Sequence, residues 1–319
     1  MYKRQPDYFL VDEHGNILEM VRRKKIIEED AVLDLPAHGA CTMIRKECLL
    51  AVGGYSEKFT CQDGLDLWVK MVPRFKPYNV NIPLFYYRRH GNNLTEDKNK
   101  LLETRGEIER DYIQSNVDIA LPKVLGLVLA VGRSAYAYSD PFVELAGEPL
   151  INYTLKELQF ATTLDKVVVS SEDDRVLKHT SQFPGIAAVK RSPQYAKANS
   201  RTEDIINEVL EHLKVTMNYK PDAVCVLFIN TPLRRGIHID RAIRALTIYQ
   251  VESVLSVQEE LGQLYFHRKF GLEAIRTSKE DLRLEREALY RANGALFLSM
   301  AEVFKRNSLL GKKVGHIII

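Results

Sequence analysis

From residue 122 onward the chain alternates short, continuously apolar runs with stretches of helical spacing. The runs Leu125–Val131 and Ala223–Ile229 contain no charged residue. Continuously apolar strands that alternate with helices are typical of a parallel sheet covered by helices on both faces. We therefore predict an α/β domain with a mainly parallel sheet. Its expected strands are 125–131, 166–170, 223–229 and 253–257, and its expected helices are 151–160, 205–213 and 239–246.

The residues before this domain are organised differently. Residues 7–115 are rich in loops, with short strands expected at 8–11, 79–81 and 85–87 and an amphipathic helix at 98–113. Residues 116–123 are expected to be a linker, and residues 124–319 to be the second domain. No internal repeat is found in either part.

Both ends of the chain look cut. Residues 1–6 are interpreted as a scar, because Met1–Gln5 resembles the peptide that a transposase library adapter encodes. The last residues, Val314–Ile319, stop inside an apolar run, and exposed ends of this kind tend to aggregate. We expect the sequence to be one part of a longer protein. The alternative is an ordinary start and a C-terminal strand.

Charge and cysteine content exclude several classes of protein. Lys and Arg total 45 against 42 Asp and Glu, a net charge of +3 that does not indicate a nucleic-acid partner. The longest apolar stretch, 124–131, is far below the ~20 residues of a membrane span. The four cysteines show neither zinc spacing nor a disulfide pattern, and we expect reduced, mostly buried thiols in a cytoplasmic protein.

Several ordered motifs in residues 7–112 resemble the C-terminal half of a family 2 glycosyltransferase. They are His38–Arg45, Gly53–Phe59, Gln62–Trp68, Pro83–His90 and Asn93–Thr95. The resemblance implies part of a GT-A-type fold in which Asp63 is the general base that takes the proton of the acceptor hydroxyl. It also implies that Gln62, which stands where the family has Glu, and His90 contact substrate. The family's nucleotide-binding half, with its Asp-x-Asp metal motif, would precede Asp7.

A structural alternative for Asp63 is a solvated turn residue before a helix that starts near Asp66, since Asp before an apolar run is a common N-cap.

A second series of motifs, over residues 124–319, resembles acylneuraminate cytidylyltransferases of the sialic-acid type. It comprises Val124–Ala130, Leu145–Ile151, Val167–Asp174, Lys190–Pro193, Thr231–Arg234, Ser253–Val257 and Asn293–Phe297. The resemblance implies a Rossmann-like nucleotidyltransferase domain that transfers CMP from CTP to a nonulosonic or related keto sugar acid and releases pyrophosphate. It also implies Mg²⁺ or Mn²⁺ in the intact parent, with ligands beyond Ile319 and none in this fragment.

The phosphate loop departs from that family. Val131, Ala135 and Asp140 stand where the family has three cations. Each lost charge-assisted hydrogen bond to phosphate removes about 1.5 to 3 kcal/mol of stabilisation. Arg133 is expected to replace one of the charges, and Ser134 keeps the family serine on the CTP side.

Other candidate residues follow from the same resemblance. Arg191 matches a family arginine near the cytosine, while Ala198 stands where an acid is usual. Asn230, Thr231 and Arg234 fall in the stretch that faces the sugar acid. The structural alternatives are a surface arginine pair at 234–235 and a plain turn at Asn293–Gly294.

The sequence thus predicts a fragment of a bifunctional surface-glycan protein, a glycosyltransferase joined to a cytidylyltransferase-like domain. Its partners would be CTP and a sugar acid, and for the parent a nucleotide sugar and a glycan acceptor. The alternative is that the second domain has lost catalysis and serves as a binding or dimerisation module. In the second case we expect the chain to form a homodimer.

Overall fold

A computed structural model describes residues 3–21, 41–90, 98–116, 119–132, 140–195, 200–260, 262, 264–269, 271–275 and 289–319. The chain divides into two compact units. One comprises residues 1–118 together with 259–290, and the other comprises residues 119–258 and 291–319. The partition predicted from the sequence, into a scar, a glycosyltransferase segment, a linker and a second domain, stays a prediction.

The first unit is built around strand β1 (Lys3–Val11), which is antiparallel to β2 (Ile17–Val21) and β3 (Met43–Ile44) and parallel to β4 (Pro77–Arg88). Its helices are α1 (Lys46–Ala51), α2 (Asp63–Met71) and α3 (Lys98–Ser115), and a separate hairpin consists of β12 (Tyr265–Arg268) and β13 (Gly271–Ala274). Leu67 and Met71 of α2 pack with Cys48 of α1. Cys61 donates a hydrogen bond to Thr104 of α3.

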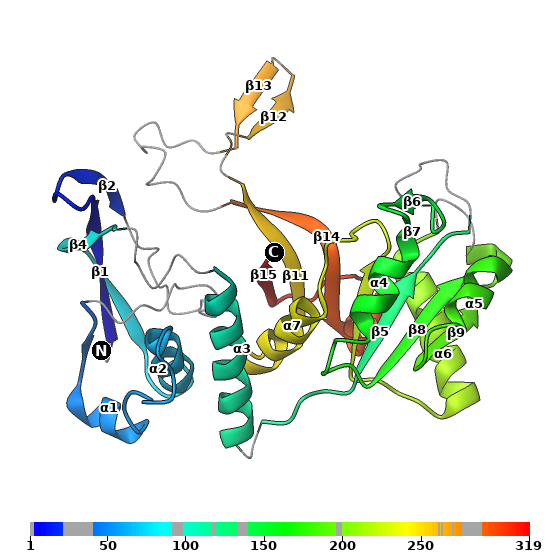
Figure 1. The fold of residues 1–319 in the computed structure, drawn as a ribbon, viewed down its shortest axis with the longest axis horizontal. Coiled ribbons are helices and arrows are strands. Elements are labelled where there is room, and N and C mark those ends of the chain that lie inside the picture. Colours follow the sequence, from blue (N-terminus) through cyan, green and yellow to red (C-terminus); the bar gives the residue numbers. More distant parts are fainter. Residues whose placement is uncertain are drawn as a thin grey trace. The chain divides into compact units, whose positions relative to one another are not determined.

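The second unit contains a seven-stranded sheet in the order β15–β11–β14–β10–β5–β8–β9 (Figure 1). Strands β10, β5, β8 and β9 are parallel, β15 is parallel to β11, and β14 is antiparallel to β10. The strand bounds are β5 (Val124–Leu129), β8 (Lys166–Ser171), β9 (Ile186–Lys190), β10 (Ala223–Phe228), β11 (Ser253–Glu260), β14 (Leu289–Met300) and β15 (Val314–Ile318). A small hairpin joins β6 (Glu144–Leu145) to β7 (Glu148–Pro149).

The helices of this unit are α4 (Leu150–Leu158), α5 (Asp174–Thr180), α6 (Thr202–Met217), α7 (Gly236–Ile248) and α8 (Ala301–Lys305), with a 3₁₀ turn at Pro193–Tyr195. Every residue of β5 is buried, so both faces of the sheet are covered there. The expected α/β fold with a mainly parallel sheet is therefore confirmed for this unit. The GT-A-type part of the predicted fold stays a prediction.

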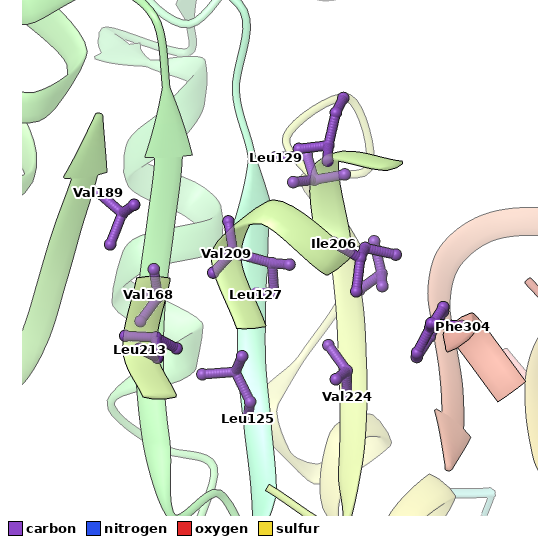
Figure 2. Close-up of a cluster of buried hydrophobic side chains, with 12 residues drawn as sticks. Leu125, Leu127, Leu129, Val168, Val189, Ile206, Val209, Leu213, Val224 and Phe304 are labelled. Atoms are coloured by element: carbon purple, nitrogen blue, oxygen red, sulfur yellow. The ribbon is translucent and has the colours of Figure 1, made fainter. Parts of the chain in front are cut away.

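The main core lies between α6 and the middle strands of this sheet. Figure 2 shows Ile206, Val209 and Leu213 of α6 on the side of the sheet that carries Leu127 of β5 and Val168 of β8. The apolar residues of α6 recur every three to four positions, which places them on one helical face.

The observed elements agree with the predicted ones to within a few residues for β5, β8, β10, β11, α4, α6 and α7. The predicted short strands 79–81 and 85–87 are one strand, β4. The residues of the alternative turn, Asn293 and Gly294, lie within β14, where Gly294 has a φ of +73°. Cys48, Cys61 and Cys225 are buried as expected, but Cys41 is exposed.

Candidate functional site

The loops that follow β5, β8 and β10 lie at the same edge of the sheet, because these strands are parallel. At this edge the backbone N–H of Gly132 donates to Glu172 Oε1 at 2.7 Å. The carbonyl oxygen of Gly132 accepts from Arg175 Nη2 at 3.0 Å. Both backbone polar groups of Gly132, the residue at which the phosphate loop would begin, thus form hydrogen bonds with side chains of the segment after β8.

Asp173 lies directly against Gly132. A Cβ atom at position 132 would be 2.1 Å from Asp173 Cβ, so only glycine fits there without a shift. Asp173 also caps α5 by accepting from the Arg175 backbone N–H at 2.8 Å. Its carboxylate accepts from the Arg175 side chain as well, with Nη2 at 2.7 Å. The close approach therefore fixes both the loop and the start of α5.

Arg191, predicted to lie on the CTP side, follows β9 and is only 3% exposed. Its Nη2 donates to the Ser170 carbonyl oxygen at 2.8 Å, and its Nη1 lies 3.6 Å from Glu172 Oε2. Burial lowers the pKa of Arg191, and the charges of Glu172 and Glu208 oppose that shift. This arginine is a buried cation that donates to a backbone carbonyl oxygen and has the carboxylate of Glu172 beside it.

The second of these carboxylates, Glu208 on α6, holds the next residue of the loop. Its Oε1 accepts from the backbone N–H of Ser192 at 3.1 Å and from the Ser192 hydroxyl. The Oε2 atoms of Glu172 and Glu208 are both buried, and no donor of the described residues makes a hydrogen bond to either of them. A buried carboxylate oxygen without a donor is costly.

Arg234 is also buried, with 3% exposure. Its Nη1 donates to the carbonyl oxygens of Phe228 and Ala295 and to Thr231 Oγ1, at 3.1, 2.7 and 2.9 Å. The structure therefore brings Thr231 and Arg234 together, while Asn230 beside them is exposed. The surface-pair alternative is wrong for Arg234, and the predicted contacts of all three residues with a sugar acid stay predictions.

Arg133 and Ser134, the two other residues predicted to bind CTP, lie outside the described residues, as does Ala135. Val131 is described and is 42% exposed. Asp140 accepts from the backbone N–H of Phe142 at 2.9 Å. The structure thus describes two of the three positions that lack the family's cations, the apolar Val131 and the acidic Asp140.

In the first unit, Asp63 is exposed and is the first residue of α2, while Gln62 is its N-cap residue. The structural alternative expected Asp63 to be solvated at the start of a helix, and it is; the helix begins at Asp63 rather than near Asp66, and the N-cap residue is Gln62. Gln62 has a left-handed backbone with a φ of 57°, an unfavourable conformation that is common at functional sites. Its Oε1 accepts from Arg105 Nε at 2.9 Å. His90 is exposed after β4.

The described residues do not fit a metal site. Among them, no group of three or more His, Cys, Asp or Glu side chains is placed to hold a metal ion. We therefore assign no chemical step to a metal in this part of the chain. The predicted Mg²⁺ or Mn²⁺ of the intact parent stays a prediction. Within the same residues, no helix is long and apolar enough to cross a membrane.

Sequence reasoning did not assign roles to Glu172, Arg175 or Glu208. A signal for Glu172 was present, because an acid that directly follows a β-branched strand lies at the carboxyl edge of a parallel sheet, where ligands bind. No comparable signal existed for Glu208, since a glutamate within an amphipathic helix usually faces water.

Comparison with known proteins finds similarity to cytidylyltransferases in part of the chain. Residues 140–269 match the family model described as Cytidylyltransferase. The 3-deoxy-manno-octulosonate cytidylyltransferase of Chlamydia felis is 30% identical over 104 residues, which are 33% of this chain and 41% of that protein. The N-acylneuraminate cytidylyltransferase of Streptococcus agalactiae is 24% identical over 168 residues, 51% of this chain and 40% of that protein.

The chain therefore spans about two fifths of the length of these curated relatives. Among solved structures, a CMP:2-keto-3-deoxy-manno-octonic acid synthetase in complex with CTP superposes with a TM-score of 0.46 at 13% identity. That superposition covers 62% of this chain and 90% of the other.

Proposed function

We propose that this chain, whose residues 140–269 are homologous to cytidylyltransferases, carries a domain that transfers CMP from CTP to a keto sugar acid. In that reaction a hydroxyl oxygen of the sugar acid forms a bond to the α-phosphorus of CTP while the bond to pyrophosphate breaks. The substrate class comes from the relatives, which are described as acting on 3-deoxy-manno-octulosonate or on N-acylneuraminate.

One observation carries the proposal. The homologous region includes the Arg191–Ser192 loop and the Thr231–Arg234 loop, which follow β9 and β10. Both loops lie at the carboxyl edge of a parallel sheet, where open α/β sheets bind their ligands. We assign Arg191, Arg133 and Ser134 to the CTP side, and Asn230, Thr231 and Arg234 to the sugar-acid side.

The test is release of pyrophosphate from CTP by the full-length parent, which includes the residues beyond Ile319, in the presence of Mg²⁺ and either 3-deoxy-manno-octulosonate or N-acetylneuraminate. We expect release only when both CTP and one sugar acid are present. ATP, GTP and UTP are the matched nucleotide controls. Release that does not depend on a sugar acid would contradict the proposal, since it would indicate simple hydrolysis.

A second candidate function is a binding module that keeps this fold without catalysis. It is favoured by Val131 and Asp140, which supply no positive charge, and by Glu172, whose carboxylate is bonded to the Gly132 N–H. The triple change Val131→Arg, Ala135→Lys and Asp140→Lys separates the two functions. If the domain has lost catalysis, the wild type releases no pyrophosphate and the variant gains affinity for CTP. A wild type that turns over at about 1 s⁻¹ or more excludes the binding module.

For residues 7–115 we propose the C-terminal part of a glycosyltransferase, with Asp63 as general base and Gln62 and His90 at the substrate. The exposed carboxylate of Asp63 at the start of α2 supports this role, because a base must reach its substrate. In the full-length parent, Asp63→Asn is expected to lower glycosyl transfer by about 10² to 10⁴. Asp111→Asn on α3 is the matched control. An Asp63→Asn enzyme with wild-type turnover would exclude this role.

A further inference from the structure

The N–H of Gly132 and the guanidinium of Arg191 lie on two sides of one carboxylate. Glu172 Oε1 accepts from Gly132 N at 2.7 Å, and Glu172 Oε2 lies 3.6 Å from Arg191 Nη1. A backbone N–H at the end of a strand and a buried arginine are the donors that proteins commonly use to bind phosphate oxygens. Here a side chain of the protein itself supplies the anion.

The carboxylate is held less well than an anion could be. Glu172 Oε2 is buried and accepts no hydrogen bond from the part of the chain that the structure describes, and its distance to Arg191 is longer than a hydrogen bond. A phosphate oxygen at this position would have the same two donors and would carry the charge that Arg191 requires. The Glu172 side chain reaches the surface, since it is 22% exposed. The Arg191 side chain, in contrast, is 2% exposed.

We infer that Gly132 N–H and Arg191 form an oxyanion site for the phosphate groups of the nucleotide, and that Glu172 occupies this site when no nucleotide is bound. This assigns Arg191 to the phosphates rather than to the cytosine, which the family resemblance implied. The inference rests on the proposed function for the identity of the ligand, a phosphate ester or pyrophosphate. Glu172 is then a determinant of affinity, because the ligand must displace it. No bond is formed or broken in this exchange.

The surrounding charges agree with an intramolecular competitor. Asp173 packs against Gly132 and pairs with Arg175, so the charge of Arg175, which also donates to the Gly132 carbonyl oxygen, is already balanced. Glu208 faces Arg191 from α6 but bonds to Ser192 rather than to Gly132. Glu172 is therefore the one carboxylate, among the described residues, that contacts both the N–H and the guanidinium.

The experiment is a calorimetric titration of the 319-residue chain with inorganic pyrophosphate, in EDTA, so that no metal contributes. Glu172→Ala is expected to bind pyrophosphate at least about tenfold more tightly than the wild type, because the Gly132 N–H and Nη1 of Arg191 lose the competing carboxylate. Glu172→Gln is expected to gain about threefold, since the amide oxygen still accepts from Gly132 but carries no charge. Asp174→Asn is the matched control, an exposed acid two residues away whose loss should change affinity less than about twofold.

Thermal unfolding of each variant shows whether it is folded, and the Gln variant retains the Gly132 contact if the Ala variant is unstable. Equal affinity in Glu172→Gln, Asp174→Asn and the wild type would overturn the inference. So would pyrophosphate binding that Mg²⁺ strengthens in the wild type but not in Glu172→Gln, because Glu172 would then be a cation ligand. Tighter pyrophosphate binding without any use of CTP would support the anion site while contradicting the proposed reaction.

Discussion

Arg234 and Thr154 are joined by a buried hydrogen bond, in which Nη2 of the arginine donates to the threonine Oγ1 at 2.8 Å. Since Nη1 of the same side chain donates to the carbonyl oxygens of Phe228 in β10 and Ala295 in β14, one guanidinium links α4 to two strands. Burial lowers the pKa of Arg234 to about 10. The cost of burying this cation is offset only while its acceptors stay in place.

Arg234→Met is therefore expected to lower the free energy of unfolding by about 2 to 4 kcal/mol, because it leaves the carbonyl oxygens of Phe228 and Ala295 without their donor. Urea unfolding measures this change. Leu233→Ala is the matched control, since Leu233 is 86% exposed and should contribute less than about 0.5 kcal/mol. An Arg234→Met protein as stable as the control would contradict the linking role.

The parallel sheet could be predicted because burial on both faces leaves a direct trace in the sequence. Leu125, Val168 and Val224 lie in runs that exclude charge, and the structure places all three in one core. The strand β9 left a weaker trace, since its burial pattern is mixed and its length is five residues.

The site could be predicted less completely. The resemblance placed Arg191 at the correct edge of the sheet, but the sequence contains no sign that this arginine is 3% exposed or that Glu172 contacts it. Burial of a charged side chain depends on partners that are distant in the chain, and a single sequence does not show which residues those are. Arg133 and Ser134 are not described, so their roles stay predictions.

The stability of the second unit is expected to depend on pH through His238. Its Nδ1 accepts from the backbone N–H of Arg235 at 3.1 Å at the start of α7. Burial, followed by the charges of nearby arginines, lowers the pKa of His238 to about 4. Between about pH 6.5 and 4 the unfolded chain binds this proton and the folded chain does not, so protonation favours unfolding.

The free energy of unfolding should therefore fall as the pH decreases from about 6.5 to about 4, and this contribution should then level off. Denaturant unfolding at pH 7, 6, 5 and 4 measures it, as the difference between the wild type and His238→Gln. The exposed His212 provides the control variant His212→Gln. The same pH dependence in all three proteins would assign it to other groups.

Asp240 of α7 is expected to contribute strongly to stability. Its carboxylate accepts from the backbone N–H groups of Thr162 and Thr163 at 2.9 and 3.0 Å, and from both threonine hydroxyls at 2.7 Å. Asp240→Asn replaces one acceptor oxygen with a donor that faces these donors, and should cost about 2 to 3 kcal/mol. Denaturant unfolding checks this value against Asp174→Asn, whose side chain is 87% exposed. Equal stability of the two variants would exclude the role.

Gly132→Ala tests the close approach between the loop after β5 and the segment after β8. The new Cβ would lie 2.1 Å from Asp173 Cβ, a distance that forces one of the two backbones to move. Such overpacking typically costs about 1 to 3 kcal/mol. Val131→Ala, at the exposed neighbouring position, should have little effect.

The second variant, Gly132→Ala with Asp173→Gly, removes the opposing Cβ. Glycine is itself tolerated as an N-cap at a cost of a few tenths of a kcal/mol, so Asp173→Gly loses chiefly its contacts with Arg175. If the clash is the cause, the double variant should be at least about 1 kcal/mol more stable than the sum of the single changes predicts. Unfolding free energies of the four proteins in the cycle give this coupling. Additive effects would mean that the two positions do not touch in solution, and the Glu172 carboxylate would then lack the fixed Gly132 N–H to which it is bonded.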